Sequence, residues 1–384
     1  MSQVESWVVG DLPFFYKCQP SPTNAAQGLP DTLPFELEFE PADGLVRQRW
    51  NPEVDQALSA GYLHGSEISG MMEADGIGRQ YADDFLAFLQ RSEGSFAGKR
   101  VLEIGCGTGY LLSRLRELGA EVMGIEPGDH GQDGARRNGV PVVQGFFPHP
   151  DVSSKFDVII AYGVLEHIVA PVQFMQQVAA QLGNGGGAYL AVPDCEPYLL
   201  NGDISCLLHE HWSYFTAYTL SRVLRRAGFA AETFNSGFGG SLYGRCRASH
   251  HIEPDGGRPD ATLFRQFRER AGAVAARMAG VFSDAEGEVG LYVPGRLMNL
   301  MSNLDPSVIS RLRFFDDNPR LTGQYFPGIP VPIEDFSSLV AHAPSSLLIA
   351  TRSFHSAIVT KLREAGVSIP TLGWADVFEA EYRA

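Results

Sequence analysis

From residue 98 onward the chain alternates short apolar runs with segments in which apolar residues recur at helical spacing. The apolar runs have the length of buried strands and are bounded by glycine, proline and polar residues. Strands are expected within residues 98–107, 121–127, 156–162 and 186–193, and helices within 110–118 and 171–182. This alternation is typical of a parallel sheet wound with crossover helices. The pattern therefore predicts an α/β fold.

The segments on either side have other patterns. Residues 1 to about 55 are rich in proline, glycine and acidic residues, and short apolar runs such as PFELEFE predict strands there. The second half of 66–90 is predicted to be helical, and a loop at 249–260 precedes a long helix near 261–280 and a second series of strands. We expect three units: a small N-terminal element (1–65), a Rossmann-like, doubly wound domain (66–255) and a smaller C-terminal Rossmann-like α/β domain (256–384).

Composition narrows the class of partner. Hydrophobic residues make up 44% and aromatic residues 11% of the 384 residues, as in globular proteins. The net charge of -15, without a basic stripe, argues against nucleic acid as a partner. Five cysteines without a C-x-x-C pair favour a reducing cytoplasm. Since no run of about 18 apolar residues occurs, we expect a soluble cytoplasmic protein without a membrane span.

A glycine-rich turn follows the strand expected after residue 98. In VLEIGCGTG the turn is built from Gly105, Cys106, Gly107 and Gly109. Glycines at such a turn let the backbone bend sharply and approach a ligand closely. Roughly 20 residues later the next strand ends in Glu126, where a carboxylate can accept hydrogen bonds from both hydroxyls of a ribose. Dinucleotide dehydrogenases use a similar turn, but Glu103 before the glycines favours a ligand that carries an ammonium group.

Together with the later strands, this set resembles the class I S-adenosylmethionine-dependent methyltransferases over roughly residues 75–235. The resemblance implies S-adenosylmethionine as the cofactor, Glu103 and the glycines as the family's first motif, and Glu126 as the ribose-binding acid. It also implies that the end of the third strand holds the adenine and that the end of the fourth faces the methionine portion. The residues at these two positions are Gln144, Gly145 and Phe146, and Tyr162 and Gly163.

A second segment, CLLHEHWSYF at 206–215, places two histidines and a glutamate among apolar and aromatic residues. Its part HEHWSYF resembles a signature of the sugar-nucleotide C-methyltransferases of deoxysugar biosynthesis. The stretch FFDDNPRLTGQYFPGIPVPI resembles a second motif of that group, so the resemblance extends over about 60–375. It implies methyl transfer to a nucleotide-linked ketosugar, at carbon, with the C-terminal domain binding the acceptor or its nucleotide.

Methylation of a carbon beside a ketone requires a base that removes the α-proton and donors that stabilise the enolate. His211 is the expected base because histidine titrates in the right range. Glu210 is expected to orient it or to bind a sugar hydroxyl. His167, after the fourth strand, is expected near the same pocket because both segments lie at the carboxyl edge of the sheet. Tyr62 is a candidate donor, although a packing role is equally compatible with its sequence context.

Structural interpretations compete with these roles. A packing role is favoured for His209, since alternate residues of an extended segment point in opposite directions, and His211 can also be a structural histidine. A metal site built from Cys206, His209 and His211 lacks a fourth ligand, and no metal is expected. The aromatic residues of the segment, Trp212, Tyr214 and Phe215, are expected in the core.

The chain departs from the sugar group at two places. The group's N-terminal zinc module needs C-x-x-C pairs, but only Cys18 is present, so an apolar core is expected there instead. Leu208 stands where the group has a tyrosine. The acceptor therefore stays open at this point, and an O- or N-methyltransferase acting on another small metabolite, or an inactive S-adenosylmethionine-binding protein, is the alternative. The sequence does not indicate an oligomeric state.

Overall fold

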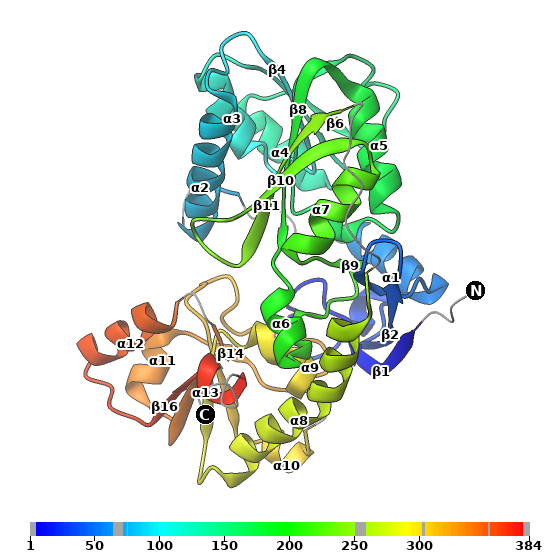
Figure 1. Ribbon diagram of the computed structural model, residues 1–384. Coiled ribbons are helices and arrows are strands. Elements are labelled where there is room, and N and C mark those ends of the chain that lie inside the picture. Colours follow the sequence, from blue (N-terminus) through cyan, green and yellow to red (C-terminus); the bar gives the residue numbers. More distant parts are fainter. Residues whose placement is uncertain are drawn as a thin grey trace.

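The computed structural model describes residues 5–63, 72–74, 76–249, 259–301, 304–351 and 354–378, and within these residues it contains three β-sheets. Figure 1 shows the largest sheet and its helices as an upper lobe, with the N-terminal strands and the C-terminal sheet below it. The predicted α/β class is confirmed.

The central sheet has the strand order β10-β11-β8-β7-β4-β5-β6. Its strands are β4 (Arg100–Ile104), β5 (Glu121–Glu126), β6 (Val142–Gln144), β7 (Phe156–Tyr162), β8 (Leu182–Pro193), β10 (Phe229–Asn235) and β11 (Ser241–Ala248). The strands β4 to β8 run parallel, and β10 and β11 add an antiparallel edge. The chain order reverses between β4 and β7, so the carboxyl ends of these two strands border the crevice in which such sheets bind ligands.

Helices cover both faces of the central sheet because its middle strands are apolar on both faces. One apolar layer joins the sheet to α2 (Gly76–Glu93) and α3 (Tyr110–Glu117), and a second joins it to α5 (Pro171–Gln181) and α7 (Ala217–Arg226). The helix α4 (Asp129–Asn138) lies beside β6 and is mostly polar. The apolar pattern of the sequence did not predict α4, and its helical conformation is explained by its contacts with the rest of the domain.

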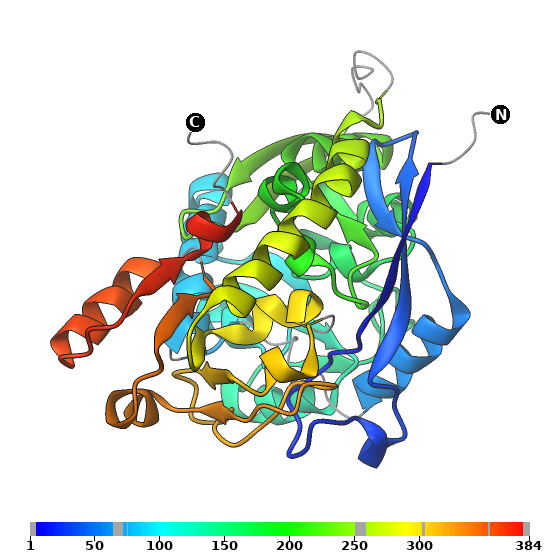
Figure 2. The same cartoon turned by 90° about the horizontal axis from the view of Figure 1, so that it is seen from below.

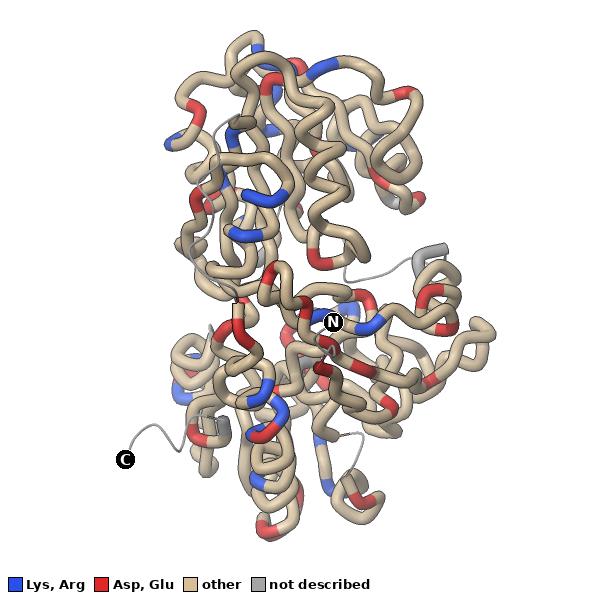
Figure 3. The backbone as a smooth tube through the Cα atoms, turned by 45° about the vertical axis from the view of Figure 1, so that its right-hand side comes forward, with Lys and Arg blue, Asp and Glu red and all other residues tan. Residues whose placement is uncertain are grey.

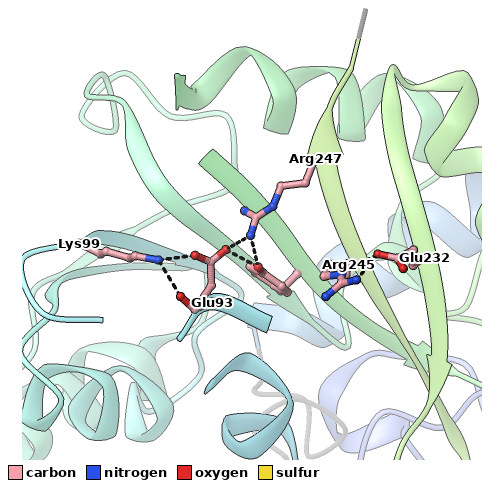
Figure 4. A network of polar contacts seen from close by, with 6 residues as sticks. Glu93, Lys99, Glu232, Arg245 and Arg247 are labelled. Atoms are coloured by element: carbon pink, nitrogen blue, oxygen red, sulfur yellow. Dashed lines mark hydrogen bonds and ion pairs between the residues drawn. The ribbon is translucent and has the colours of Figure 1, made fainter. Parts of the chain in front are cut away.

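An ionic network fixes the end of α2 against the sheet (Figure 4). The Glu93 carboxylate pairs with Lys99 and with Arg247, and it accepts a hydrogen bond from the Tyr189 hydroxyl. Arg247 also donates to that hydroxyl, at 2.8 Å. Burial alone would raise the pKa of Glu93, but these three donors outweigh it and leave the pKa lowered. The network therefore stabilises the ionised carboxylate where α2 meets β8.

The N-terminal element is an antiparallel sheet of β1 (Ser6–Pro13), β2 (Thr32–Glu40) and β3 (Leu45–Gln48), with the short helices η1 (Ala25–Gln27) and α1 (Pro52–Leu63). The strands expected around PFELEFE are confirmed by β2, whose side chains alternate between buried and exposed positions. An apolar cluster built around Phe14, Tyr16 and Trp212 fills this element, and Cys18 is buried nearby in a neighbouring cluster. The fourth strand, β9 (Ser213–Tyr214), comes from the HEHWSYF segment.

The C-terminal sheet is parallel and has the order β14-β13-β12-β15-β16. Its strands are β12 (Val289–Tyr292), β13 (Leu312–Phe315), β14 (Ile333–Glu334), β15 (Ser346–Ile349) and β16 (Thr371–Gly373). Its helices are η4 (Pro294–Leu297), α9 (Met298–Met301), α10 (Pro306–Ile309), α11 (Phe336–Ala341), α12 (His355–Glu364) and α13 (Trp374–Phe378). The predicted second α/β series is thus a second doubly wound sheet.

A shared core joins the N-terminal and C-terminal sheets. The long helix α8 (Thr262–Asp284) lies between them (Figure 2), and its Phe264 and Phe267 contact Phe39 and Trp7 of the N-terminal strands. The segment with α6 (Glu196–Asn201) and η3 (Ile204–Cys206) belongs to the same core. Asn299 donates to the backbone carbonyls of residues 204 and 207 and so holds this segment against the C-terminal domain.

Candidate active site

The predicted glycine turn follows β4. Gly105, Gly107 and Gly109 have φ angles of 69°, 50° and 71°, in the left-handed region that side chains disfavour. A Cβ atom on Gly105 would lie 2.7 Å from Val164 Cγ2, and one on Gly109 would lie 2.5 Å from Val140 Cγ2. The turn therefore needs glycine for its backbone and for its packing. Its backbone N–H groups donate within the fold, those of Gly105 and Gly109 to the carbonyl oxygens of Ile125 and Cys106, and α3 begins directly after the turn.

Glu126 ends β5 and is bound to this turn. One carboxylate oxygen accepts a hydrogen bond from the Gly107 N–H at 3.0 Å, and the other accepts one from the Gly128 N–H at 3.0 Å. The side chain is buried. A carboxylate is an acceptor for several hydrogen bonds at once, so this group is of the kind that can hold a turn and bind hydroxyl hydrogens.

Two glycines of α4 allow the helix to approach this acid closely, and the sequence reasoning missed them. A Cβ atom on Gly131 would lie 2.5 Å from Glu126 Cγ, and one on Gly134 would lie 2.3 Å from Thr108 Cα. Both distances are too short for any side chain. The detectable signal was the three-residue spacing of glycines in HGQDGA, which puts both on one face of a helix.

Glu103 is a buried acid that forms no ion pair within the described part of the chain. Its side chain is 3% exposed, and its Oε2 accepts no hydrogen bond from the described residues. Burial, and then the nearby charge of Glu126, raise the pKa of Glu103 well above its ordinary range. A bound cation would reverse both effects. The Cys106 thiol packs against Gly124, so a ligand contact by this residue would use its backbone.

The residues expected around the rest of the cofactor lie at the same edge. Gln144 ends β6 and donates to Asp129 Oδ1 at 2.7 Å. Phe146 is 67% exposed, which leaves an aromatic ring available to a base. Gly145, between them, has a φ of 153°. Tyr162 ends β7 and is partly buried against the edge of other aromatic rings, and burial raises its pKa.

The two histidines of HEHWSYF have different surroundings, as predicted, although the His211 N–H donates to the Leu208 carbonyl oxygen in a turn and the segment is not extended there. The His209 ring bonds to the carbonyl oxygen of Leu33 through Nε2 at 3.1 Å and contacts the rings of Phe14 and Phe35. Burial lowers the pKa of His209 to about 4, so it is a structural residue of the N-terminal element. The expected core positions of the aromatic residues are confirmed for Trp212, Tyr214 and Phe215.

His211 lies instead beside His167. The ring centroids are 4.9 Å apart and the rings are nearly perpendicular, at 77°. The backbone joins the two segments, because the Trp212 N–H donates to the Glu166 carbonyl oxygen at 2.7 Å. His167 Nδ1 lies 3.0 Å from the Glu210 carbonyl oxygen. A carbonyl only accepts, so Nδ1 carries the proton and Nε2 keeps its lone pair. Burial lowers the pKa of His167 to about 4, which keeps the ring neutral.

Two buried carboxyl groups complete the cluster. Glu166, in the 3-10 helix η2 (Leu165–His167), and Glu210 are each 3% exposed. Glu166 Oε2 and Glu210 Oε1 accept no hydrogen bond from the described residues. Burial raises the pKa of each to about 8, and for Glu210 the charge of Glu166 adds to this. Sequence reasoning singled out His167 but not Glu166, although the acid directly precedes it. One ligand atom each from Glu166, His167 and His211 lies within 4.8 Å of the others.

Tyr62 cannot be placed in this cluster or outside it. Its backbone belongs to the last turn of α1, but its side chain lies outside the described residues. The candidate site thus unites the turn after β4, the ends of β5, β6 and β7, and the 209–212 segment. The turn and the strand ends form a part that suits a ligand with an ammonium group and a ribose. The 209–212 segment and the residues after β7 form a second part, which contains two imidazoles and two carboxyl groups.

Residues 74–233 match the model of a family described as a methyltransferase domain. The tRNA U34 carboxymethyltransferase of Idiomarina loihiensis is 34% identical over 148 residues, which cover 35% of this chain and 46% of that protein. The C-methyltransferase NovU of Streptomyces niveus is 23% identical over 293 residues, or 70% of each protein. A solved structure, the DhpI-SAM-HEP complex, matches with 20% identity and a TM-score of 0.41, over 52% of this chain and 100% of that one. The chain spans less than half of the tRNA-modifying relative.

The distribution of charged residues and the hydropathy of the helices bear on the class of partner. Acidic residues and basic residues, some of them in short pairs such as Arg136 and Arg137, are interspersed along the described part of the chain (Figure 3), and the net charge is -15. None of the described helices combines the length and the apolar character that crossing a bilayer requires. The expectation that nucleic acid is not a partner stays a prediction, since one relative carries a tRNA-modifying name.

Proposed function

We propose that the protein, whose residues 74–233 match a methyltransferase domain, transfers the methyl group of S-adenosylmethionine to a nucleotide-linked ketosugar, at the carbon beside the carbonyl. The observation that carries this proposal is the cluster of His211, His167, Glu166 and Glu210 at the carboxyl edge of the cofactor-binding sheet. Carbon methylation through an enolate requires a base at that position.

The cofactor half of the site assigns a role to each acid. Glu103 holds the ammonium group of S-adenosylmethionine, because it is a buried carboxyl without a hydrogen-bond donor on Oε2. Glu126 accepts the ribose hydroxyls while it keeps the glycine turn in place. The exposed ring of Phe146, with Gln144, borders the adenine, and Tyr162 borders the methionine portion.

The acceptor half handles the proton. His211 takes the α-proton of the ketosugar, and Glu210 orients the ring or binds a sugar hydroxyl. His167 stays neutral and is fixed by its bond to the Glu210 carbonyl oxygen, so it lines the pocket in one orientation. Tyr62 supplies a phenolic donor to the enolate oxygen. Transfer of the methyl group from the sulfonium then forms the new carbon–carbon bond and leaves S-adenosylhomocysteine.

The C-terminal domain is proposed to hold the nucleotide of the acceptor. Its sheet reverses strand order between β12 and β15, which is where such sheets bind ligands. Val293, directly after β12, has a φ of 59°, the only positive φ among the described residues other than glycine. Strained backbone of this kind concentrates at ligand-binding turns. The alignment with the C-methyltransferase of Streptomyces niveus over 70% of both chains also supports a role beyond the central domain.

Hydrogen exchange tests the proposal directly. Nucleotide-linked ketosugars are incubated with the protein in D2O without S-adenosylmethionine, and deuterium uptake is read by mass spectrometry. The wild-type protein should exchange one α-hydrogen, His211→Ala should exchange it about a hundredfold more slowly or worse, and the control His149→Ala should match the wild type. His149 is a suitable control because it stands in the loop after β6, beside Asp151.

Two other outcomes would replace the proposal. Methylated product without exchange at carbon would identify an O- or N-methyltransferase, and the tRNA-modifying name of one relative makes tRNA a substrate to include in that screen. Tight cofactor binding without product from either class of acceptor would identify a binding protein that has lost its chemistry.

A further inference from the structure

We propose that Glu166, His167 and His211 form a binding site for a divalent transition-metal ion of the Zn²⁺ class. One ligand atom from each side chain lies within 4.8 Å of the other two. Two imidazoles and one carboxylate are a ligand set that Zn²⁺, Co²⁺ and Fe²⁺ accept, with further coordination positions left open. Around a zinc ion with bonds of about 2.0 Å, ligand atoms stand about 3.3 Å apart. The side chains therefore have to close on the ion by roughly 1 Å.

The surroundings of His167 match those of a metal ligand. Metal-binding histidines usually donate their second ring nitrogen to a carbonyl or carboxylate, which fixes the tautomer and aims the other nitrogen at the ion. His167 Nδ1 makes that bond to the Glu210 carbonyl oxygen at 3.0 Å. Nε2 is therefore the nitrogen with the lone pair, in a ring whose centroid lies 4.9 Å from that of His211.

Glu166 supplies an independent observation. Its side chain is 97% buried, since only 3% of it is exposed, and its Oε2 accepts no hydrogen bond from the described residues. A buried carboxylate oxygen in that position is costly unless a cation or a donor meets it. The neighbouring Glu210 adds a second buried carboxyl group close to the same point. The two carboxyl groups therefore offer oxygen ligands to a cation, and a bound cation would favour their ionised form.

Metal binding at this site opposes the proposed reaction. The ion would occupy a nitrogen of His211, and a nitrogen that coordinates a metal cannot accept a proton. The ion-bound protein is then an inhibited form, and removal of the ion restores the base. This consequence rests on the proposed function, whereas the metal site itself rests only on the geometry.

Cobalt absorption tests the site without reference to activity. Co²⁺ alone is titrated into the full chain, and its visible d–d bands report nitrogen and oxygen coordination. The wild-type protein should bind one Co²⁺, which Zn²⁺ displaces, and Glu166→Gln should weaken binding at least tenfold. His149→Ala should leave binding unchanged, because this histidine stands beside Asp151 and is not one of the three grouped ligands.

Two variants keep the test decisive. Circular dichroism and thermal melting establish which of Glu166→Gln and His211→Ala is folded. A folded variant of either kind should bind Co²⁺ at least tenfold more weakly than the wild-type protein. Absence of Co²⁺ bands in the wild-type protein, or equal affinity in the folded variant, overturns the site. Zn²⁺ at saturation should also stop deuterium exchange of the ketosugar. Bound Zn²⁺ with undiminished exchange overturns the inhibited form, while failure of exchange in metal-free protein counts against the proposed function alone.

Discussion

The buried acid Glu103, the proposed partner of the cofactor's ammonium group, should make cofactor affinity depend on pH. In the free protein burial and the charge of Glu126 raise its pKa well above the ordinary value near 4.5, so it holds a proton over a range of pH above that value. The ammonium group of the cofactor binds only the ionised form well. Binding therefore releases a proton, and affinity should increase as the pH rises towards the pKa of the free protein.

The size of the pH effect on the dissociation constant follows from the release of one proton for each cofactor molecule bound. Below the raised pKa, each pH unit changes the dissociation constant about tenfold, or about 1.4 kcal/mol. The sign agrees with linkage for stability. A carboxyl whose pKa is raised by folding destabilises the free protein as pH rises from its unfolded to its folded pKa. Cofactor binding should offset that loss, so the cofactor-induced rise in melting temperature should also grow with pH.

Glu103→Gln removes the titrating group and keeps its shape. Above the raised pKa the variant should bind S-adenosylmethionine about a hundredfold or more weakly, the scale of losing one partner of a buried ion pair. At acid pH the two proteins should converge, because a protonated glutamate and a glutamine are both neutral.

Calorimetry between pH 5 and 7 provides the measurement, since the ammonium of the cofactor, with a pKa near about 7.7, stays charged there. Titration in two buffers of different ionisation enthalpy counts the protons released. A dissociation constant that is flat over this range in the wild-type protein, with no proton released, would refute the reasoning. So would an equal slope in Glu103→Gln.

Three further predictions concern other parts of the molecule. Gly107→Val should abolish cofactor binding in calorimetry, because a β-branched side chain is strained at a φ of 50° and projects into the ligand's path; retained affinity would contradict this placement of the cofactor. His211→Ala should lower kcat about a hundredfold or more while cofactor affinity stays within a factor of two, and unchanged turnover would remove His211 from the mechanism. Glu93→Gln should lower the free energy of unfolding in urea by about 2 kcal/mol at pH 7, since its charged bonds to Lys99 and Arg247 weaken. Because folding lowers the pKa of Glu93, the difference in unfolding free energy between the two proteins should shrink when the pH falls below 4.5 towards the folded pKa. A difference that persists at the most acid pH would contradict this role of Glu93.

The sequence predicts the central sheet well because its strands are apolar on both faces and end at recognisable residues. Glu126 could be assigned from its position at a strand end, and the structure places it against the Gly107 N–H. The helix α4 could not be predicted, because DHGQDGARRN has no apolar periodicity and is held by the close approach of its glycines. The edge hairpin of β10 and β11 was missed as well.

Some residues of the candidate site could likewise be predicted from the sequence, and others could not. Different surroundings for His209 and His211 were predicted, and the structure has them, but through a turn at 208–211 and not through the alternation of an extended segment. Glu166 could not be recognised, since its importance arises only where η2 meets the 209–212 segment, across more than 40 residues of sequence. Tyr62 remains a prediction from resemblance, because its side chain lies outside the described residues.

The strand β9 has a consequence for the order in which the chain acquires structure during synthesis. The ribosome releases β1, β2 and β3 long before residues 213 and 214 emerge, so the N-terminal sheet waits for its last strand until most of the central domain has been translated. The edge of β3 stays unpaired for that interval, exposed to strands from other nascent chains. His209, which bonds to the Leu33 carbonyl oxygen, lies in the same late segment, so this contact of the N-terminal element also forms only after the central domain has been largely translated.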